Sequence, residues 1–273
     1  MRERTMKGNS VRRKCWKKLA AGLLAGILMV AQVQPAQAGR YDKYPVTPCN
    51  WGLGRNTAHK TPGTAYAKVL KGKNAYYYVS SKPKKKRIYL SFDCGYENGH
   101  TASILDTLKR KNVKAIFFVT KGYLESSPKL VSRMKKEGHL VGNHTMNHPA
   151  MAGLAPKRIR QEILGCERLM KKLTGYEMDR YIRPPMGNFS ARSLKVTKDL
   201  GYTTILWSMA FYDYDTENQP GRQAIIDQFM TYYHPGAITL FHAVSDSDDR
   251  ALGSIIHQMR LKGYRFGTLD ELN

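Results

Sequence analysis

Residues 139–149 read His139-Leu-Val-Gly-Asn-His144-Thr-Met-Asn-His148-Pro149, a short apolar run that ends in a loop carrying two histidines four residues apart. Short apolar runs of this kind are typical of buried strands. Neutral imidazoles are common ligands of zinc and related metals. The stretch therefore predicts a strand followed by a pair of metal ligands. Because the same spacing also arises by chance in ordinary loops, the pair needs support from the rest of the chain.

On both sides of this stretch, runs rich in β-branched and aromatic residues alternate with amphipathic helical patterns. The predicted strands are Arg87–Asp93, Lys114–Thr120, His139–Asn143, Arg180–Arg183, Thr203–Ser208, Gly236–Phe241 and Tyr264–Phe266. The predicted helices are Thr101–Lys111, Pro128–Glu137, Pro156–Thr174, Ser190–Leu200, Gly221–Tyr233 and Asp248–Lys262. This alternation predicts an α/β fold with parallel strands, either a β/α barrel or an open doubly wound sheet.

Polar residues gather where these strands end. Asp93 ends the first strand, His144 and His148 follow the third, and Arg183 ends the fourth. The remaining two are Asp213 and His242, which follow the fifth and sixth strands. In a β/α barrel the carboxyl ends of the strands form the catalytic face. Scattered surface or core residues would not sort in this way, so the separate signals support one another.

The chemistry of these residues suits hydrolysis assisted by a metal. Asp93 precedes a glycine-bearing turn, where its carboxylate could take a proton from water; the alternative is a cap for the next helix. Arg183, stiffened by the two prolines that follow, is suited to hold a carboxylate. His242 could protonate a leaving amine and Asp213 could keep it charged, although a hydrogen-bonded core histidine would look the same.

The N-terminus has the layout of a secretory signal. Basic residues precede an apolar run at Leu19–Val33, and a small-x-small site ends at Ala38. We expect an exported, extracytoplasmic protein, or a membrane-anchored one if the signal is not cleaved. Residues 1–38 are the predicted signal peptide, 39–85 an irregular wrapping segment, and 86–273 the main domain.

The charge of the chain limits its possible partners, and its cysteine content limits its possible disulfides. The net charge is +24, of which residues 1–38 carry only seven, so the exported part remains basic. After export the available polyanions are wall polymers and lipid headgroups, so we expect no nucleic acid partner. The three remaining cysteines, Cys49, Cys94 and Cys166, argue against a disulfide framework.

Five ordered motifs resemble those of the polysaccharide deacetylases (NodB-homology, carbohydrate esterase 4). The motifs are Ser91-Phe-Asp-Cys-Gly95, His144-Thr-Met-Asn-His148, Arg183-Pro-Pro-Met-Gly187, Asp213-Tyr214 and Leu240-Phe-His242. The resemblance covers about residues 85–270. The stretches Phe92–Gly99 and Asn218–Gly221 look like the branch that de-N-acetylates muramic acid on the way to muramic δ-lactam in spore-cortex peptidoglycan.

The resemblance implies a role for each motif. Asp93 would be the general base, oriented by Arg183, and His144 and His148 would bind a divalent metal, most simply zinc. His242 would be the general acid, tuned by Asp213. It also implies a distorted (β/α) barrel with about seven parallel strands.

The chain departs from the family pattern at some positions. Cys94 stands where the family has a second, metal-binding Asp; a thiolate can also bind zinc, and the alternative is a cysteine that takes no part in metal binding. Ala210 and Tyr214 replace an acid and a tryptophan of the fourth motif, so the substrate groove is expected to differ. Tyr214 would contact substrate, and a backbone N–H near Met186 would stabilise the oxyanion.

The expected activity is hydrolysis of a linear amide, the acetamide of N-acetylmuramic acid in peptidoglycan glycan strands. A nearer alternative is deacetylation of N-acetylglucosamine or chitooligosaccharides. A second alternative, suggested by Cys94 and the basic surface, is a non-catalytic wall-binding protein that also binds anionic wall polymers.

Overall fold

The computed structural model describes residues 39–54, 58–80 and 85–272. The described residues from Tyr41 onward form one compact unit. The predicted signal peptide at 1–38 lies outside the described residues and stays a prediction. Within the described ranges, none of the helices combines the length and the apolar character needed to cross a membrane.

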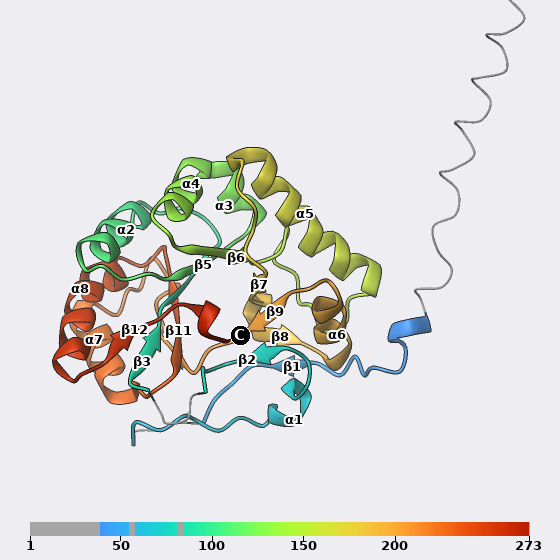
Figure 1. Cartoon of the computed structure of the whole chain (residues 1–273), viewed down its shortest axis with the longest axis horizontal. Helices are drawn as coiled ribbons and strands as arrows, with labels where there is room; N and C mark the ends of the chain where they lie inside the picture. The colour runs from blue at the N-terminus through green and yellow to red at the C-terminus, as the bar shows by residue number, and fades with distance from the viewer. Residues whose placement is uncertain (1–38, 55–57, 81–84, 273) are drawn as a thin grey trace, which may run out of the picture. The chain divides into compact units, whose positions relative to one another are not determined.

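The larger sheet runs in the order β12-β3-β11-β4-β5-β6-β7-β9-β2, with β10 beside β11, and its strand pairs are parallel. Its strands are β2 (Ala75–Tyr76), β3 (Arg87–Tyr89), β4 (Ser91–Cys94), β5 (Ile116–Val119), β6 (Leu140–Asn143), β7 (Tyr181–Ile182), β9 (Thr203–Ile205), β10 (Met209–Ala210), β11 (Ala237–His242) and β12 (Arg265–Phe266). Figure 1 shows the strands at the centre with helices around them. The predicted α/β class and parallel sheet are confirmed.

The run from Thr203 to Ala210 closes the sheet into a barrel. Its start, β9, pairs with β7, whereas its end, β10, pairs with β11. Between the two, the backbone N–H of Ser208 donates to the carbonyl of Ile238 at 2.9 Å. The single strand predicted at Thr203–Ser208 is therefore two short strands, because the chain bends there to bridge both edges.

All six predicted helices are present. They are α2 (Thr101–Arg110), α4 (Pro128–Lys136), α5 (Pro156–Thr174), α6 (Ala191–Asp199), α7 (Arg222–Tyr232) and α8 (Asp246–Leu261), and the short α1 (Ala67–Leu70) and α3 (Lys121–Ser126) were not predicted. Helix α8 begins earlier than expected because Ser245 is its N-cap and accepts a hydrogen bond from the backbone N–H of Asp248 at 3.1 Å.

The N-terminal segment is less irregular than predicted. Its β1 (Cys49–Asn50) pairs antiparallel with β8 (Asn188–Phe189), and β2 adds an edge to the main sheet. Trp51 and Leu70 are buried against Phe189. Both strands are only two residues long, too short to show a period in the sequence.

Side chains alternate between the two faces of the barrel wall. On β5, Phe117 and Val119 join the cluster under the helices, whereas Ile116 and Phe118 join a cluster that includes Ile238. This two-residue period follows from strand geometry. The same alternation on β4 determines which of its residues face the carboxyl-end site.

Candidate active site

The fold brings the predicted polar residues together at the carboxyl ends of the strands. His242, the last residue of β11, lies directly beside Asp93 of β4 in the strand register. Arg183 follows β7, and its backbone N–H donates to the carbonyl of Asn143, the residue that precedes His144. The predicted convergence at this end of the barrel is therefore what the structure shows.

Asp93 is held by the guanidinium of Arg183. Arg183 is fully buried, and its Nη1 donates to Asp93 Oδ1 at 2.8 Å while Nη2 donates to Ser91 Oγ at 2.6 Å. Burial alone would raise the pKa of Asp93, but the charge and hydrogen bond of Arg183, with the charge of His242, lower it below its ordinary value. The carboxylate is thus ionised and fixed in one orientation.

The loop after β6 aims His144 at this carboxylate. His144 Nδ1 lies 2.8 Å from the carbonyl oxygen of Arg183, which can only accept, so Nδ1 carries the proton. Nε2 therefore has a free electron pair and lies 3.5 Å from Asp93 Oδ2. Burial lowers the pKa of His144 to about 4, so this imidazole stays neutral. A neutral imidazole with a fixed tautomer is the form that binds metals.

His148 is held beside His144 by a strained loop. Their ring centroids are 4.8 Å apart. Thr145 and His148 both have positive φ, 69° and 53°, which costs free energy in residues other than glycine. The strain is offset by Glu162 of α5, a buried carboxylate that accepts from the backbone N–H of Asn147 at 2.8 Å and from its side-chain amide at 2.9 Å.

The two imidazoles suit a divalent metal, but only as two of the usual three protein ligands. Among the residues that the structure describes, no group of three or more His, Cys, Asp or Glu side chains is placed to hold one ion. The donor set therefore fits a metal that takes His144 and His148 and leaves its other positions to water or substrate.

The structure gives no support to Cys94 as a third ligand, because Cys94 is not among the residues that line the cavity with Asp93, His144 and His148. Asp93 faces the site, so the next residue on the strand faces the helices, and Cys94 is fully buried in the cluster between sheet and helices. Burial, with the charges of Asp93 and Glu97, raises the pKa of Cys94 well above its ordinary value. A thiol packed in this apolar cluster, on the other face of the strand from Asp93, is not placed to share an ion with the two imidazoles. Cys49 and Cys166 are also free and buried.

His242 and Asp213 form a second, separate unit. Asp213 is fully buried, with Oδ1 2.7 Å from His242 Nδ1, and its Oδ2 accepts from the backbone N–H of His242 at 2.7 Å. Burial alone would lower the pKa of His242, but the hydrogen bond and charge of Asp213, with the charge of Asp93, raise it above its ordinary value. The pair with Asp213 therefore favours the charged form of the imidazole, the form that can give up a proton.

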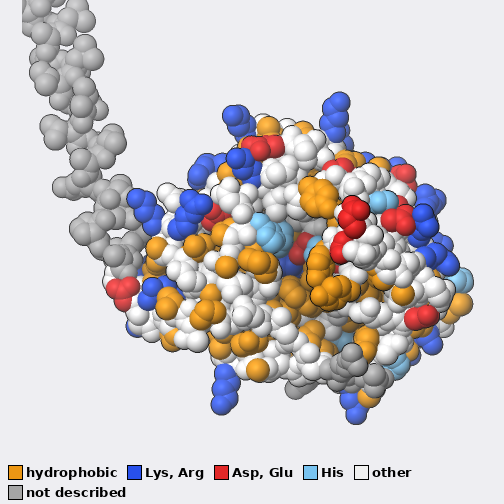
Figure 2. Space-filling model, turned by 180° about the vertical axis from the view of Figure 1, so that it is seen from behind, with side chains coloured by type: hydrophobic (Ala, Val, Ile, Leu, Met, Phe, Trp, Pro, Cys, Tyr) orange, Lys and Arg blue, Asp and Glu red, His pale blue; other side chains and the backbone are white. Residues whose placement is uncertain are grey.

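These groups line one cavity of about 420 Å³. Its walls are Asp93, Gly95, His144, His148, Met186, Trp207, Tyr214, Leu240 and His242. Figure 2 shows a hollow where histidine and acidic side chains lie among hydrophobic ones. Met186 and Tyr214 are 60% and 50% exposed, so they can touch a ligand that extends beyond the cavity. Arg183 and Asp213 lie behind this surface and act on it through Asp93 and His242.

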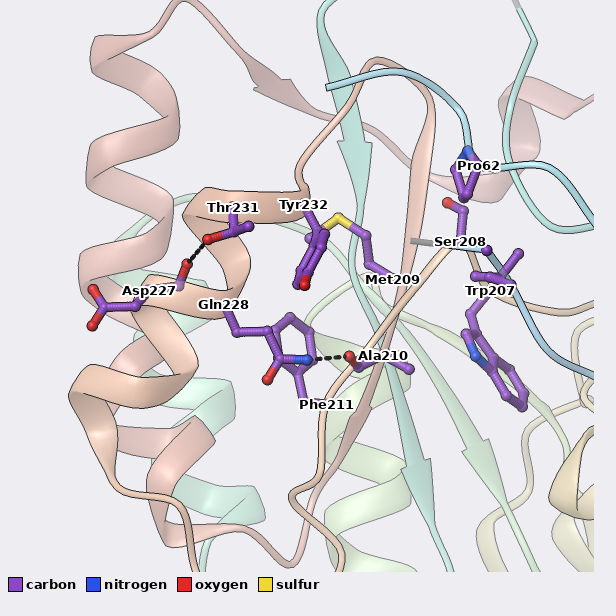
Figure 3. A pocket seen from close by; sticks show the side chains of 12 residues that line it. Pro62, Trp207, Ser208, Met209, Ala210, Phe211, Asp227, Gln228, Thr231 and Tyr232 are labelled. Atoms are coloured by element: carbon purple, nitrogen blue, oxygen red, sulfur yellow. Dashed lines mark hydrogen bonds between the residues drawn. The ribbon is translucent and has the colours of Figure 1, made fainter. Parts of the chain in front are cut away.

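A larger cavity of about 610 Å³ also has Trp207 in its lining (Figure 3). Its polar groups bond to one another: Gln228 Nε2 donates to the carbonyl of Ala210 and Thr231 Oγ1 to that of Asp227, both at 2.8 Å. Size alone therefore does not mark the reactive cavity, which is the smaller one with titratable groups.

Four residues of the site were missed from sequence. Ser91 binds Arg183, Trp207 forms a wall, Glu162 holds the histidine loop, and Asp248 lies behind Asp213. Ser91 could have been found, since it lies two residues before Asp93 and shares its face of the strand. The others come from distant segments.

The chain is similar to known proteins of one family. A family model described as polysaccharide deacetylase matches residues 80–205. The peptidoglycan-N-acetylmuramic acid deacetylase PdaA of Bacillus subtilis (strain 168) is 38% identical over 251 residues, 91% of this chain and 95% of that protein. A peptidoglycan-N-acetylglucosamine deacetylase of Bacillus cereus is 33% identical over 237 residues, 84% of this chain and 82% of that protein. The solved structure of Bacillus subtilis PdaA, a family 4 carbohydrate esterase, matches with a TM-score of 0.80 at 40% identity, covering 84% of this chain and 97% of that one.

Proposed function

The chain belongs to the polysaccharide deacetylase family, and from that premise we propose that it removes the acetyl group from N-acetylmuramic acid in peptidoglycan, on the way to muramic δ-lactam. One observation carries the proposal: Asp93, whose pKa is lowered, and His242, whose pKa is raised, line the same cavity, each fixed by its own buried partner. Groups whose environments push their pKa values apart are the usual mark of an acid and a base.

Asp93 is the proposed general base. Its lowered pKa keeps it ionised, and Arg183 holds Oδ1 so that Oδ2 is left facing His144. The carboxylate takes a proton from the attacking water as oxygen bonds to the acetamide carbonyl carbon. A backbone N–H near Met186 donates to the oxyanion that develops on the carbonyl oxygen.

His242 is the proposed general acid. Its raised pKa keeps a proton on the ring, and Asp213 binds Nδ1, so the proton at Nε2 goes to the departing nitrogen. The C–N bond breaks, and acetate and a free amine result. Such an amine can then close on the lactyl carboxyl of muramic acid to form the δ-lactam.

Deacetylases of this family are in general metal-dependent. His144 and His148 would hold the ion here, and we propose zinc because imidazoles suit it. A bound divalent metal lowers the pKa of water and polarises a carbonyl.

The substrate and its place are part of the proposal. The similarity to the N-acetylmuramic acid enzyme supports the muramic acid assignment, and the N-acetylglucosamine enzyme is the basis of the alternative. Tyr214 and Met186, at the rim, would contact the glycan strand. The basic chain and its apolar N-terminal run support export to the wall or cortex side, where anionic wall polymers would attract it.

Acetate release from two glycans tests this. Denuded glycan strands with the lactyl group and chitooligosaccharides without it are incubated with the purified protein, with and without zinc. We expect zinc-dependent acetate from the first, lost in His148→Ala and kept in His257→Ala, a control histidine on α8. Preference for the second would assign N-acetylglucosamine, and no acetate with wall binding intact would leave the non-catalytic alternative.

A further inference from the structure

Asp248 is a buried acid that the proposed reaction does not use. It lies in the first turn of α8, where its backbone N–H already bonds to the N-cap Ser245. Its side chain turns inward and is 2% exposed. Neither carboxyl oxygen has a hydrogen-bond partner among the described groups that donate. Because an ionised carboxylate is costly to bury without donors, the charged form is disfavoured here.

Asp213 is the neighbour that determines whether Asp248 is protonated. Gln219 joins the two segments: its Nε2 donates to the backbone carbonyl of Asp213 at 2.8 Å, and its Oε1 accepts from the backbone N–H of Ser247, the residue before Asp248, at 3.1 Å. Two neighbouring carboxylates cannot readily both be ionised. Burial, then the contact with Asp213, raises the pKa of Asp248 well above its ordinary value, against the smaller effects of the His242 backbone and Ser245. Asp213 already accepts two hydrogen bonds from His242, whereas neither oxygen of Asp248 has a donor among the described groups, so a proton shared by the two lies on Asp248.

We propose that Asp248 is a positioning residue, a neutral carboxylic acid whose O–H donates to Asp213 and so completes a chain Asp248–Asp213–His242. This rests on the proposed function of His242 as general acid. The third donor holds the Asp213 carboxylate in one orientation without adding a second negative charge behind the imidazole. The titratable and charged groups around His242 are then Asp213, Asp93, Arg183, His148 and Tyr214. The imidazole is charged by one carboxylate behind it rather than two.

The test is the titration of the His242 ring, followed by NMR of the whole protein labelled in histidine. Asp248→Asn replaces one neutral donor by another, so the pKa of His242 should move by less than about 0.3 unit. If Asp248 were ionised, the same variant would remove a negative charge and lower that pKa by about one unit or more, which overturns the proposal.

The rate of acetate release tests the positioning. Asp248→Asn should keep kcat within about threefold, whereas Asp248→Ala, which lacks the donor, should lower it about tenfold and raise the pKa of His242. An Asp248→Ala enzyme with unchanged kcat would refute the positioning role. Asp249→Asn is the matched control, because Asp249 is the next acid on α8 and lies 3.4 Å from His100 instead; it should change neither quantity.

The two readouts separate this inference from the proposed function. The NMR titration needs no substrate, so a protein that released no acetate would still show whether Asp248 is neutral. A wild-type protein without activity refutes the deacetylase, and a His242 pKa that falls in Asp248→Asn refutes the proposal about Asp248.

Discussion

Replacing Arg183 by lysine keeps the positive charge but removes the planar guanidinium, which holds Asp93 and Ser91 in place. Arg183 makes two short bonds, to Asp93 Oδ1 and Ser91 Oγ, and Nε donates to the carbonyl of Ile205 at 3.3 Å. Its guanidinium carbon lies 4.4 Å from the centroid of the Phe118 ring. One ammonium on a flexible stem cannot serve these directions at once.

The expected cost is set by the bonds that are lost. If lysine keeps the contact with Asp93, the Ser91 hydroxyl and the Ile205 carbonyl lose a charged donor, and hydrogen bonds to charged groups contribute about 1.5–3 kcal/mol each. Allowing for relaxation, we expect the free energy of unfolding to fall by about 3 kcal/mol. We expect kcat to fall about a hundredfold, because a base displaced by 1 Å can cost that much.

Urea unfolding and acetate release measure the two effects. The midpoint should drop with the m-value unchanged, and kcat should fall more than KM rises. Arg180→Lys is the control, because Arg180 makes a half-exposed pair with Glu167 at 2.8 Å and should change the unfolding free energy by less than about 0.5 kcal/mol. An Arg183→Lys protein with the wild-type midpoint and kcat would refute the positioning of Asp93 by Arg183.

Three further outcomes are expected. Burial lowers the pKa of His139 to about 4 from 6.5, so between these pH values the unfolded chain binds more protons than the folded one. The contribution of His139 to the free energy of unfolding should therefore be full above pH 6.5 and fall by about 2–3 kcal/mol toward pH 4. Urea unfolding across this pH range measures the loss, which should be smaller in His139→Gln. Cys94→Ala should lower stability by about 1–2 kcal/mol yet leave zinc affinity in calorimetry unchanged, whereas a weakened affinity would restore Cys94 as a ligand. Tyr214→Ala should raise KM about fivefold with little change in kcat, since the ring lies at the rim 5.7 Å from His242; an unchanged KM would remove it from substrate contact.

The sequence by itself determined the fold class and the acids, histidines and arginine at the centre of the site. Strands and helices could be predicted because the spacing of apolar residues within a short segment reveals its secondary structure. The predicted helix Pro156–Thr174 agrees with α5 at both ends. Asp93, the two histidines, Arg183 and His242 were identified because a parallel barrel places the ends of its strands together. Strands of two residues, such as β1 and β2, could not be predicted, since so short a run has no period.

The tertiary structure alone decided which way each side chain faces and what lies behind it. Cys94 follows Asp93 directly, yet packing turns it toward the helices and out of the site. Asp248 meets Asp213 only because α8 begins where β11 ends, beside the loop that carries Asp213. Burial, and with it the protonation of these acids, depends on contacts between residues far apart in the chain, and no local pattern in the sequence encodes it.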